Sequence, residues 1–147
     1  MDNINQQSTS KEVSKLVARA RKAQLIYENY SQEQVDEVVT ALGWSIINPD
    51  NNAELAAMSV ADTGLGNIED KITKNHRKTL GLLRDLKDKK TVGVVAEYPE
   101  KGLVEIARPV GVVGAIVPST NPAATPANKT INALKCRNAM ILAPSPK

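Results

Sequence analysis

The residues best suited to chemistry lie in a proline-rich stretch, Pro118–Pro126, with the sequence PSTNPAATP. An apolar run ends just before this stretch, and a helical pattern follows it. In open α/β sheets, ligands bind beyond the carboxyl ends of parallel strands, which is where this stretch falls. The side-chain amide of Asn121 can donate a hydrogen bond to a developing oxyanion, and one such donor is worth about 3 kcal/mol. Asn121 is therefore a candidate catalytic residue.

A structural role for Asn121 competes with this one. Asn followed by Pro is also the usual order of a helix N-cap and the first helical residue. A helix that began at Pro122 would have Pro126 as its fifth residue, where a backbone N–H is normally needed. The helical pattern itself extends from about residue 127 to 135, and Thr125 and Pro126 make the better cap and first position. From the residues alone, both roles of Asn121 stay open.

The surrounding elements predict the α/β class: N-terminal helices, a β-hairpin, and then the start of a Rossmann-like parallel sheet. Apolar spacing predicts four helices before residue 91, and β-branched segments on both sides of Pro99–Gly102 predict the hairpin. The runs 112–117 and 138–143 predict parallel strands buried on both faces, joined by a helix in a right-handed βαβ unit. Such strands need further neighbours, so we expect an incomplete α/β domain.

Local signals predict where the helices begin and end. Thr9 with Glu12, and Ser31 with Gln34, have the spacing of capping boxes. Gly43 is the predicted end of the second helix, and the turn 63–66 ends the third. Asn67 is the predicted cap of a fourth helix, with a buried stripe formed by Ile68, Ile72, Leu80, Leu83 and Leu86.

Composition excludes several classes of protein. The 147 residues are 41% hydrophobic and 24% charged, which predicts a folded chain. The single cysteine, Cys136, allows no intrachain disulfide and no thiolate zinc cluster, and His76 has no second histidine, so we predict no metal site. Aromatic residues are too few for stacking on single-stranded nucleic acid. No apolar run approaches the roughly 18 residues of a membrane span, so we expect a cytoplasmic protein with neither nucleic acid nor membrane as partner.

Basic residues are densest in the segment 71–90, within a chain of net charge +3. Acidic residues are interleaved with them, which favours a solvated helix face over a polyanion site. His76 lies in this segment, where a surface or packing role is favoured over that of a base.

The segment RPVGVVGAIVPSTNPAATPANKTINALKCRNAMILAPSPK, residues 108–147, resembles the aldehyde dehydrogenase superfamily, and above all its CoA-acylating branch. Members read much like P-x-G-x-x-x-x-I-x-P-x-x-N-P followed by a lysine-bearing helix and R-N-A. The segment DTGLGNIEDKITKN, residues 62–75, resembles the same branch. The resemblance covers almost the whole chain from Lys11 on.

The resemblance implies an enzyme in which a cysteine thiolate attacks an aldehyde, NAD or NADP takes the hydride, and coenzyme A is the co-substrate. It maps the oxyanion-hole asparagine of the family onto Asn121. Many members have Lys-Pro where this chain has Ala143–Pro144, so the contact of that lysine with the ribose is missing here. Lys129 matches a common helix lysine of unassigned role. The implied cofactor-binding residues are Pro118, Ser119, Thr120, Pro144 and Ser145.

The resemblance also implies a division of the chain. Residues 1–90 form the N-terminal helical part of the cofactor domain, residues 91–110 a protruding hairpin, and residues 111–147 the truncated first βαβ unit of the NAD(P)-binding domain. In the superfamily such hairpins commonly pair between subunits, which implies a homo-oligomer. The nucleophilic cysteine of the family lies beyond Lys147, so Cys136 is expected to be incidental and the chain an N-terminal fragment.

The segments STNPAATPANK and RKTLGLLRDLK resemble acylating enzymes assigned to sulfoacetaldehyde, which favours this substrate over acetaldehyde. A sulfonate needs cationic or N–H donors in its pocket. Two alternatives stay open: a non-catalytic α/β module that binds a nucleotide or a protein, and an ordinary water-using aldehyde dehydrogenase. Open strand edges argue against the first. Ala143 in place of lysine, and the order Asn121–Pro122, argue against the second.

Overall fold

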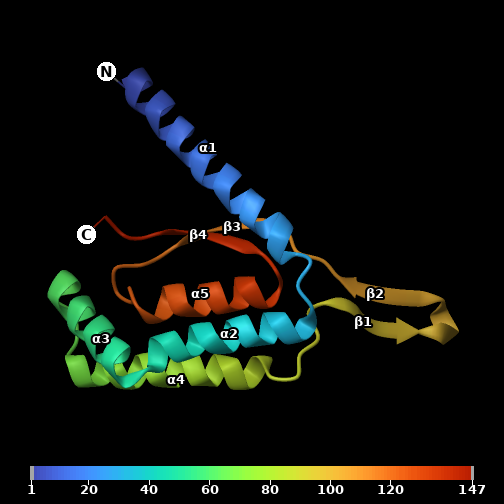
Figure 1. The fold of residues 1–147 in the computed structure, drawn as a ribbon. Helices are drawn as coiled ribbons and strands as arrows, with labels where there is room; N and C mark the ends of the chain where they lie inside the picture. Colours follow the sequence, from blue (N-terminus) through green and yellow to red (C-terminus); the bar gives the residue numbers. More distant parts are fainter. Residues whose placement is uncertain (1, 147) are drawn as a thin grey trace.

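The computed structural model describes residues 2–146, with the backbone alone for residues 2–8, and Figure 1 shows its arrangement. The helices are α1 (Asp2–Tyr27), α2 (Gln32–Ile47), α3 (Pro49–Thr63), α4 (Ile68–Leu86) and α5 (Ala124–Lys135). The strands are β1 (Gly93–Tyr98), β2 (Leu103–Ala107), β3 (Val112–Ile116) and β4 (Ala139–Ala143), and a short 3-10 turn, η1 (Pro99–Lys101), joins β1 to β2. This order of helices, hairpin and parallel strand pair confirms the predicted fold class.

The core lies where α2, α4 and α5 pack together (Figure 1). Val35 and Val39 of α2 and Ile131 of α5 are its fully buried members. Burying each such side chain contributes about 1.5–3 kcal/mol. Further aliphatic side chains of α4 and α5 pack around these three, namely Leu82, Leu83, Leu86 and Leu134.

The parallel pair β3–β4 lies between α5 and α1, and both helices contact both strands. Its register runs from Val112 opposite Ala139 to Ile116 opposite Ala143. The expected burial of both faces is wrong near the carboxyl ends, since Ile116 is 86% exposed. The reason is that α1 crosses the pair at an angle and leaves these ends uncovered (Figure 1).

Two predicted helix starts are confirmed in atomic detail. Ser31 Oγ accepts a hydrogen bond from the Gln34 backbone N–H, and Gln34 Oε1 accepts one from the Ser31 N–H, which completes a capping box. Asn67 Oδ1 accepts from the Asp70 N–H at 2.9 Å and so caps α4. The end of α3 is also as predicted, because Gly64 follows it with a φ of 64°, a left-handed conformation suited to glycine.

Two predicted helix boundaries are wrong, the start of the first helix and the end of the second. The first helix begins at Asp2, so Thr9 lies within it and does not cap it. No glycine or proline precedes Thr9 to interrupt the helix. The second helix continues through Gly43 to Ile47. Gly43 is buried there because α2 passes so close to α4 that a Cβ at this position would overlap Leu83 Cδ1.

This close approach gives a prediction with a matched control. We expect Gly43→Val to lower the free energy of unfolding by about 1–3 kcal/mol, because the larger side chain overpacks the contact with Leu83. Gly81→Ala in α4 is the control, since a Cβ there meets nothing within 4 Å. Alanine should stabilise that helical position by about 0.5–1 kcal/mol. Urea denaturation of the two variants measures both effects, and effects of the same sign would contradict the prediction.

The contact between α3 and α4 is polar, which corrects the predicted stripe of α4. Ile68 and Leu80 are exposed, whereas Leu83 and Leu86 pack on the core as predicted. The side chains that α4 buries toward its N-terminal end are Lys71, Asn75 and Thr79.

Hydrogen bonds satisfy part of this polar contact. The Asn75 amide donates to Asn52 Oδ1 of α3 at 3.0 Å, and the Asn52 amide donates to the Ile72 carbonyl at 3.0 Å. Burial, and secondly the nearby charge of Lys74, lowers the pKa of Lys71. The helical period of α4 is confirmed, but the buried face is rotated toward polar residues, of which Asn75 meets a polar partner on α3.

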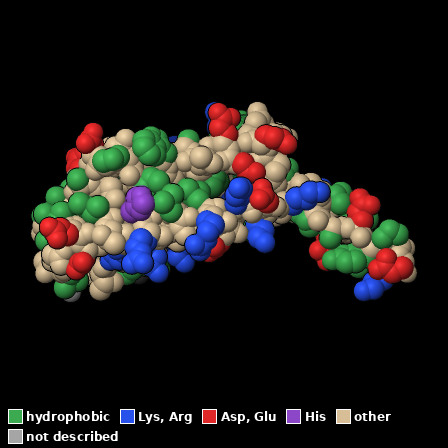
Figure 2. All heavy atoms as spheres, turned by 90° about the horizontal axis from the view of Figure 1, so that it is seen from below, with side chains coloured by type: hydrophobic (Ala, Val, Ile, Leu, Met, Phe, Trp, Pro, Cys, Tyr) green, Lys and Arg blue, Asp and Glu red, His purple; other side chains and the backbone are tan. Residues whose placement is uncertain are grey.

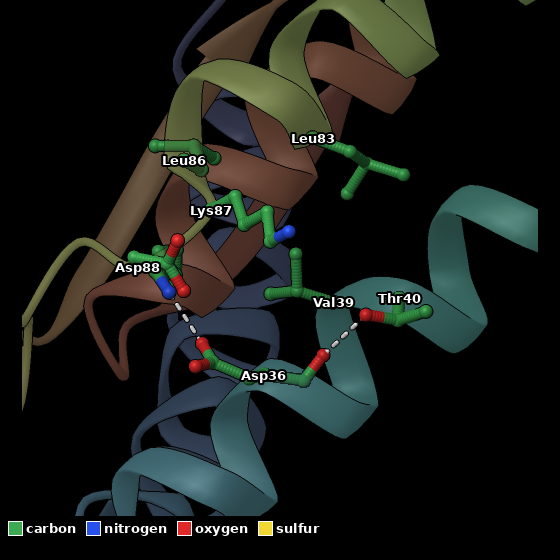
Figure 3. A pocket seen from close by; sticks show the side chains of 8 residues that line it. Asp36, Val39, Thr40, Leu83, Leu86, Lys87 and Asp88 are labelled. Carbon is green, nitrogen blue, oxygen red and sulfur yellow. Dashed lines mark hydrogen bonds and ion pairs between the residues drawn. The ribbon is translucent and has the colours of Figure 1, made fainter.

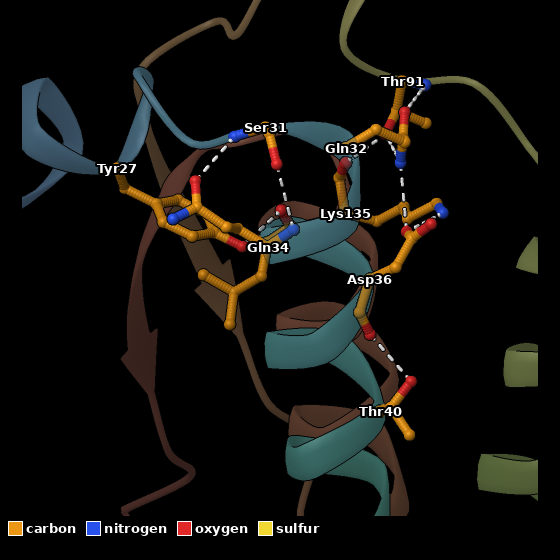
Figure 4. Close-up of polar contacts among 9 residues, drawn as sticks. Tyr27, Ser31, Gln32, Gln34, Asp36, Thr40, Thr91 and Lys135 are labelled. Atoms are coloured by element: carbon orange, nitrogen blue, oxygen red, sulfur yellow. Dashed lines mark hydrogen bonds and ion pairs between the residues drawn. The ribbon is translucent and has the colours of Figure 1, made fainter.

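A polar network joins α2 and α5 to the start of the hairpin segment (Figure 4). Lys135 at the end of α5 forms an ion pair with Asp36 of α2. The Thr91 N–H donates to Gln32 Oε1 at 2.8 Å, and the Thr91 hydroxyl donates to the Lys135 carbonyl at 2.5 Å. These bonds fix the point at which the chain leaves the helical layer.

The hairpin β1–β2 projects away from the rest of the chain (Figure 1). Its antiparallel register pairs Val94 with Ile106 and Tyr98 with Leu103. Arg137 connects it to the body, because its Nη2 donates to the Ala107 carbonyl at 3.2 Å and its Nη1 donates to the Glu28 carbonyl at 2.5 Å. Within residues 2–146, no helix has the length and apolar character needed to cross a bilayer.

Candidate functional site

The turn that follows β3 is tight and leads directly into α5. The Asn121 N–H donates to the Pro118 carbonyl at 3.3 Å, which closes a four-residue turn. Helix α5 begins at Ala124, and its N-cap, Ala123, forms no side-chain capping bond. The prediction of Thr125 as cap and Pro126 as first residue is therefore wrong. Pro126 is the third helical residue, which is tolerated because the N–H groups of the first turn have no partner within the helix.

Asn121 does not cap the helix, which removes its competing structural role. Its side chain is half-buried and makes no hydrogen bond with the described residues 2–146. The side-chain amide is therefore available to a ligand. It lines a groove of about 320 Å³ between α4 and α5, together with Lys78, Ala124, Thr125, Asn128, Lys129 and Asn132.

A second hollow, the cleft at the carboxyl ends of β3 and β4, has a volume of about 360 Å³. In Figure 1 the chain segments that follow the two strands run toward the end of α3 and the start of α5. Four predicted cofactor-binding residues line this cleft, namely Pro118, Ser119, Pro144 and Ser145. Thr120 is exposed on the turn and lines neither the cleft nor the groove.

The remaining walls of the cleft come mainly from apolar residues and from the end of α3. Val117, Pro122, Pro126 and Leu142 supply the apolar surface. Asp62 and Thr63, which sequence reasoning missed, complete the opposite wall. The Thr63 hydroxyl is held in place, since it donates to the Ser59 carbonyl at 2.6 Å and accepts from the Leu65 N–H at 3.2 Å. The turn after Thr63 was recognisable from its glycines, but its nearness to β3 was not.

Cys136, the single thiol, lies far from Asn121. It is exposed at the C-terminal end of α5, whereas Asn121 precedes the N-terminal end, and a helix of that length spans about 18 Å. The two groups do not act on one substrate atom. The described residues also contain no group of three or more His, Cys, Asp and Glu that could hold a metal ion.

A smaller cavity of about 160 Å³ lies between α2, α4 and α5 (Figure 3). Its walls include Val39, Leu83 and the ion pair of Asp36 with Lys135. Because the Asp36 carboxylate is already paired, this cavity belongs to the structural network rather than to a candidate active site.

Comparison with known proteins agrees with this geometry. Residues 4–147 match the sequence model of the aldehyde dehydrogenase family. An acylating sulfoacetaldehyde dehydrogenase of Cupriavidus necator is 62% identical over 141 residues, which is 96% of this chain and 29% of that protein. The chain thus spans less than a third of the length of this relative.

Solved structures show the same fold. The crystal structure of an acetylating aldehyde dehydrogenase from Geobacillus thermoglucosidasius superimposes with a TM-score of 0.90 at 39% identity, over 97% of this chain and 31% of that one. The propionaldehyde dehydrogenase of Rhodopseudomonas palustris with bound propionyl-CoA superimposes with a TM-score of 0.74 at 31% identity, over 88% of this chain and 28% of that one.

Proposed function

The chain belongs to the aldehyde dehydrogenase family, and we propose that it is the N-terminal part of a CoA-acylating member. The enzyme oxidises a short aldehyde to its acyl-CoA with NAD+ or NADP+. One observation carries this proposal: the side-chain amide of Asn121, which makes no hydrogen bond within the described residues, lies just after the carboxyl end of β3 and next to the cleft.

Asn121 stabilises the oxygen of the reacting aldehyde. When a thiolate adds to the carbonyl carbon, the oxygen gains negative charge, and the Asn121 amide donates a hydrogen bond to it. The nucleophile comes from a part of the enzyme other than this chain, because Cys136 lies at the wrong end of α5. The nicotinamide cofactor supplies the hydride acceptor, and CoA is the final acyl acceptor.

The cleft holds the cofactor in this proposal. Pro118 and Pro144 give it apolar walls, and Ser119 and Ser145 bring hydroxyl groups to its rim. Thr120 lies outside this cleft, on the adjacent turn, and its role in binding the cofactor stays a prediction. The surfaces of the cleft suit a nicotinamide dinucleotide, because apolar walls can cover a flat ring while hydroxyl and backbone groups bind the ribose and the phosphates. We divide the whole protein accordingly, with residues 1–90 and 111–147 in the cofactor domain and residues 91–110 as an oligomerisation hairpin.

Sulfoacetaldehyde is the favoured substrate and acetaldehyde the second. The relative named for sulfoacetaldehyde is 62% identical to this chain. The cationic groove next to Asn121 would bind a sulfonate group through charge-assisted hydrogen bonds. The methyl group of acetaldehyde cannot form such bonds.

The test is an assay of the whole purified protein. NAD+ or NADP+ should be reduced when sulfoacetaldehyde and CoA are both present, with the acyl-CoA identified by mass spectrometry. Reduction without CoA, with release of the free acid, would indicate an ordinary water-using aldehyde dehydrogenase. The absence of turnover with either aldehyde, together with nucleotide binding, would indicate a non-catalytic module.

The hairpin gives a separate prediction about assembly. Val94, Val104 and Ile106 are exposed on β1 and β2, and both outer strand edges are open within residues 2–146. We therefore expect the hairpin to pair between subunits, and Ile106→Lys to lower the oligomeric state measured by light scattering. Glu105→Lys introduces the same side chain on the opposite face of β2 and should leave assembly unchanged. If both variants dissociate to the same extent, or if neither dissociates, the result would argue against a specific hairpin interface.

A further inference from the structure

The groove next to Asn121 carries two positive charges that come from different helices. Lys78 projects from α4 and Lys129 from α5. The other polar residues that line this groove are Asn121, Thr125, Asn128 and Asn132, and none of the lining residues is acidic. The charge of the groove is therefore positive, and every polar neighbour is neutral.

Neither lysine is neutralised by the rest of the described chain. The ion pairs found in residues 2–146 join Lys15 to Glu12, Arg84 to Asp85 and Lys135 to Asp36. Of the acidic residues nearest to Lys78 on the same helix, Asp85 is already paired with Arg84. Asp70 lines the adjoining hollow with Lys74, Arg77 and Lys78. Asp70 precedes Lys78 by two turns of α4, about 12 Å along the axis, and already accepts a hydrogen bond from the Asn67 amide at 2.7 Å.

The charge is visible on the molecular surface. Figure 2 shows blue side chains gathered along one face of the molecule near the purple histidine. Most of these cations face open solvent, where an anion is held weakly. Lys78 and Lys129 are exposed too, but they differ because they line one concave volume together with several amide groups, that of Asn121 among them.

We infer that Lys78 and Lys129 bind the anionic group of the substrate, so that the enzyme selects short aldehydes that carry a sulfonate or a carboxylate. This inference rests on the proposed function. With the carbonyl oxygen at the Asn121 amide, the far end of a short substrate lies within the same groove. Charge-assisted hydrogen bonds from ammonium groups then hold its anionic end. Lys78 and Lys129 are thus specificity-determining residues.

The experiment compares substrates and variants in the whole enzyme. For Lys78→Met we expect KM for sulfoacetaldehyde to rise about tenfold to a hundredfold, with KM for acetaldehyde unchanged, because one charge-assisted bond to the anion is lost. Lys129→Met should act in the same direction, and Lys78→Arg should restore most of the selectivity. Succinate semialdehyde tests whether a carboxylate is accepted in place of the sulfonate.

Two controls test whether the lysines act on the aldehyde and not on another anion. Lys74 lies one turn earlier on α4 and lines only the neighbouring hollow. The variant Lys74→Met should therefore leave every KM unchanged. A second source of anion is the phosphate of CoA or of the cofactor. If Lys78→Met instead raises KM for CoA or for NAD(P)+ with both aldehydes, the groove binds phosphate and the inference is overturned.

The remaining outcomes also decide the question. Equal effects of Lys78→Met on both aldehydes, or none on either, overturn the inference while the proposed function stands. If the unmodified enzyme oxidises neither aldehyde, the proposed function itself fails. Thermal unfolding of each variant shows whether a change in activity comes from loss of the fold or from loss of the cation. Lys78 and Lys129 are both exposed, so their replacement should leave the fold intact.

Discussion

Replacing Asn121 with alanine should lower kcat of the whole enzyme about a hundredfold to a thousandfold, the usual loss when one oxyanion donor is removed. The ratio kcat/KM should fall by a similar factor, because the hydrogen bond strengthens only as the oxygen becomes charged. Steady-state kinetics with saturating CoA measures both quantities. Asn121→Asp should be at least as harmful, since a carboxylate repels the developing charge.

The alternative, that Asn121 is only a turn residue, predicts a different result. Its backbone N–H closes the turn onto Pro118, and this bond survives the change to alanine. A pure turn role would therefore leave kcat within about threefold of normal and would alter thermal stability instead. Asn29→Ala is the matched control, because Asn29 is an exposed asparagine just after α1 whose side-chain amide donates to the Leu25 carbonyl of that helix. A kcat that is unchanged in Asn121→Ala would remove the catalytic assignment.

Features fixed by neighbouring residues were predictable from the sequence. The caps at Ser31 and Asn67 are local hydrogen bonds between residues three positions apart, so their spacing was a sufficient signal. The start of α5 offered no such signal, because Ala123 forms no capping bond and the prolines suggested a later start. Local chemistry therefore located Asn121 in a turn but misplaced the helix that follows it by two residues.

Features fixed by packing between distant segments were not predictable. In the sequence Gly43 looks like the end of a helix. Its contact with Leu83 of α4, which explains the glycine, is visible only in the fold. In the sequence Lys78 lies among interleaved charges that are typical of a solvated helix face. Nothing in its own helix indicates that Lys129 and Asn121 line the same groove. Asp62 and Thr63 join the cleft for the same reason. Single candidate residues are thus recognisable in the sequence, and the fold supplies the neighbours that make them a site.

The ion pair between Asp36 and Lys135 gives the largest expected effect on stability, and the effect should be unequal for its two members. The Lys135 side chain is 4% exposed, whereas that of Asp36 is 44% exposed. Removing the carboxylate by Asp36→Ala leaves a buried ammonium group without its counter-charge. We expect a loss of about 3 kcal/mol in the free energy of unfolding.

Removing the buried member should cost less. In Lys135→Met the apolar stem keeps its packing and the buried charge disappears. The Asp36 carboxylate that remains is half-exposed, can be hydrated, and still accepts a hydrogen bond from the Gln32 amide at 3.0 Å. We expect a loss of about 1 kcal/mol or less, as for an exposed pair.

The double variant tests the reason for this inequality. If Asp36→Ala is harmful because it strands the Lys135 charge, adding Lys135→Met should recover stability, so that the double variant unfolds less readily than Asp36→Ala alone. Native-state hydrogen exchange of the α2 and α5 amides measures the local free energy of opening in the whole protein. Because Lys135 also accepts a bond from Thr91 through its backbone carbonyl, which methionine retains, the hairpin segment should stay in place in every variant. Additive losses in the double variant would instead mean that Asp36 stabilises the fold through Gln32 and not through the buried ammonium.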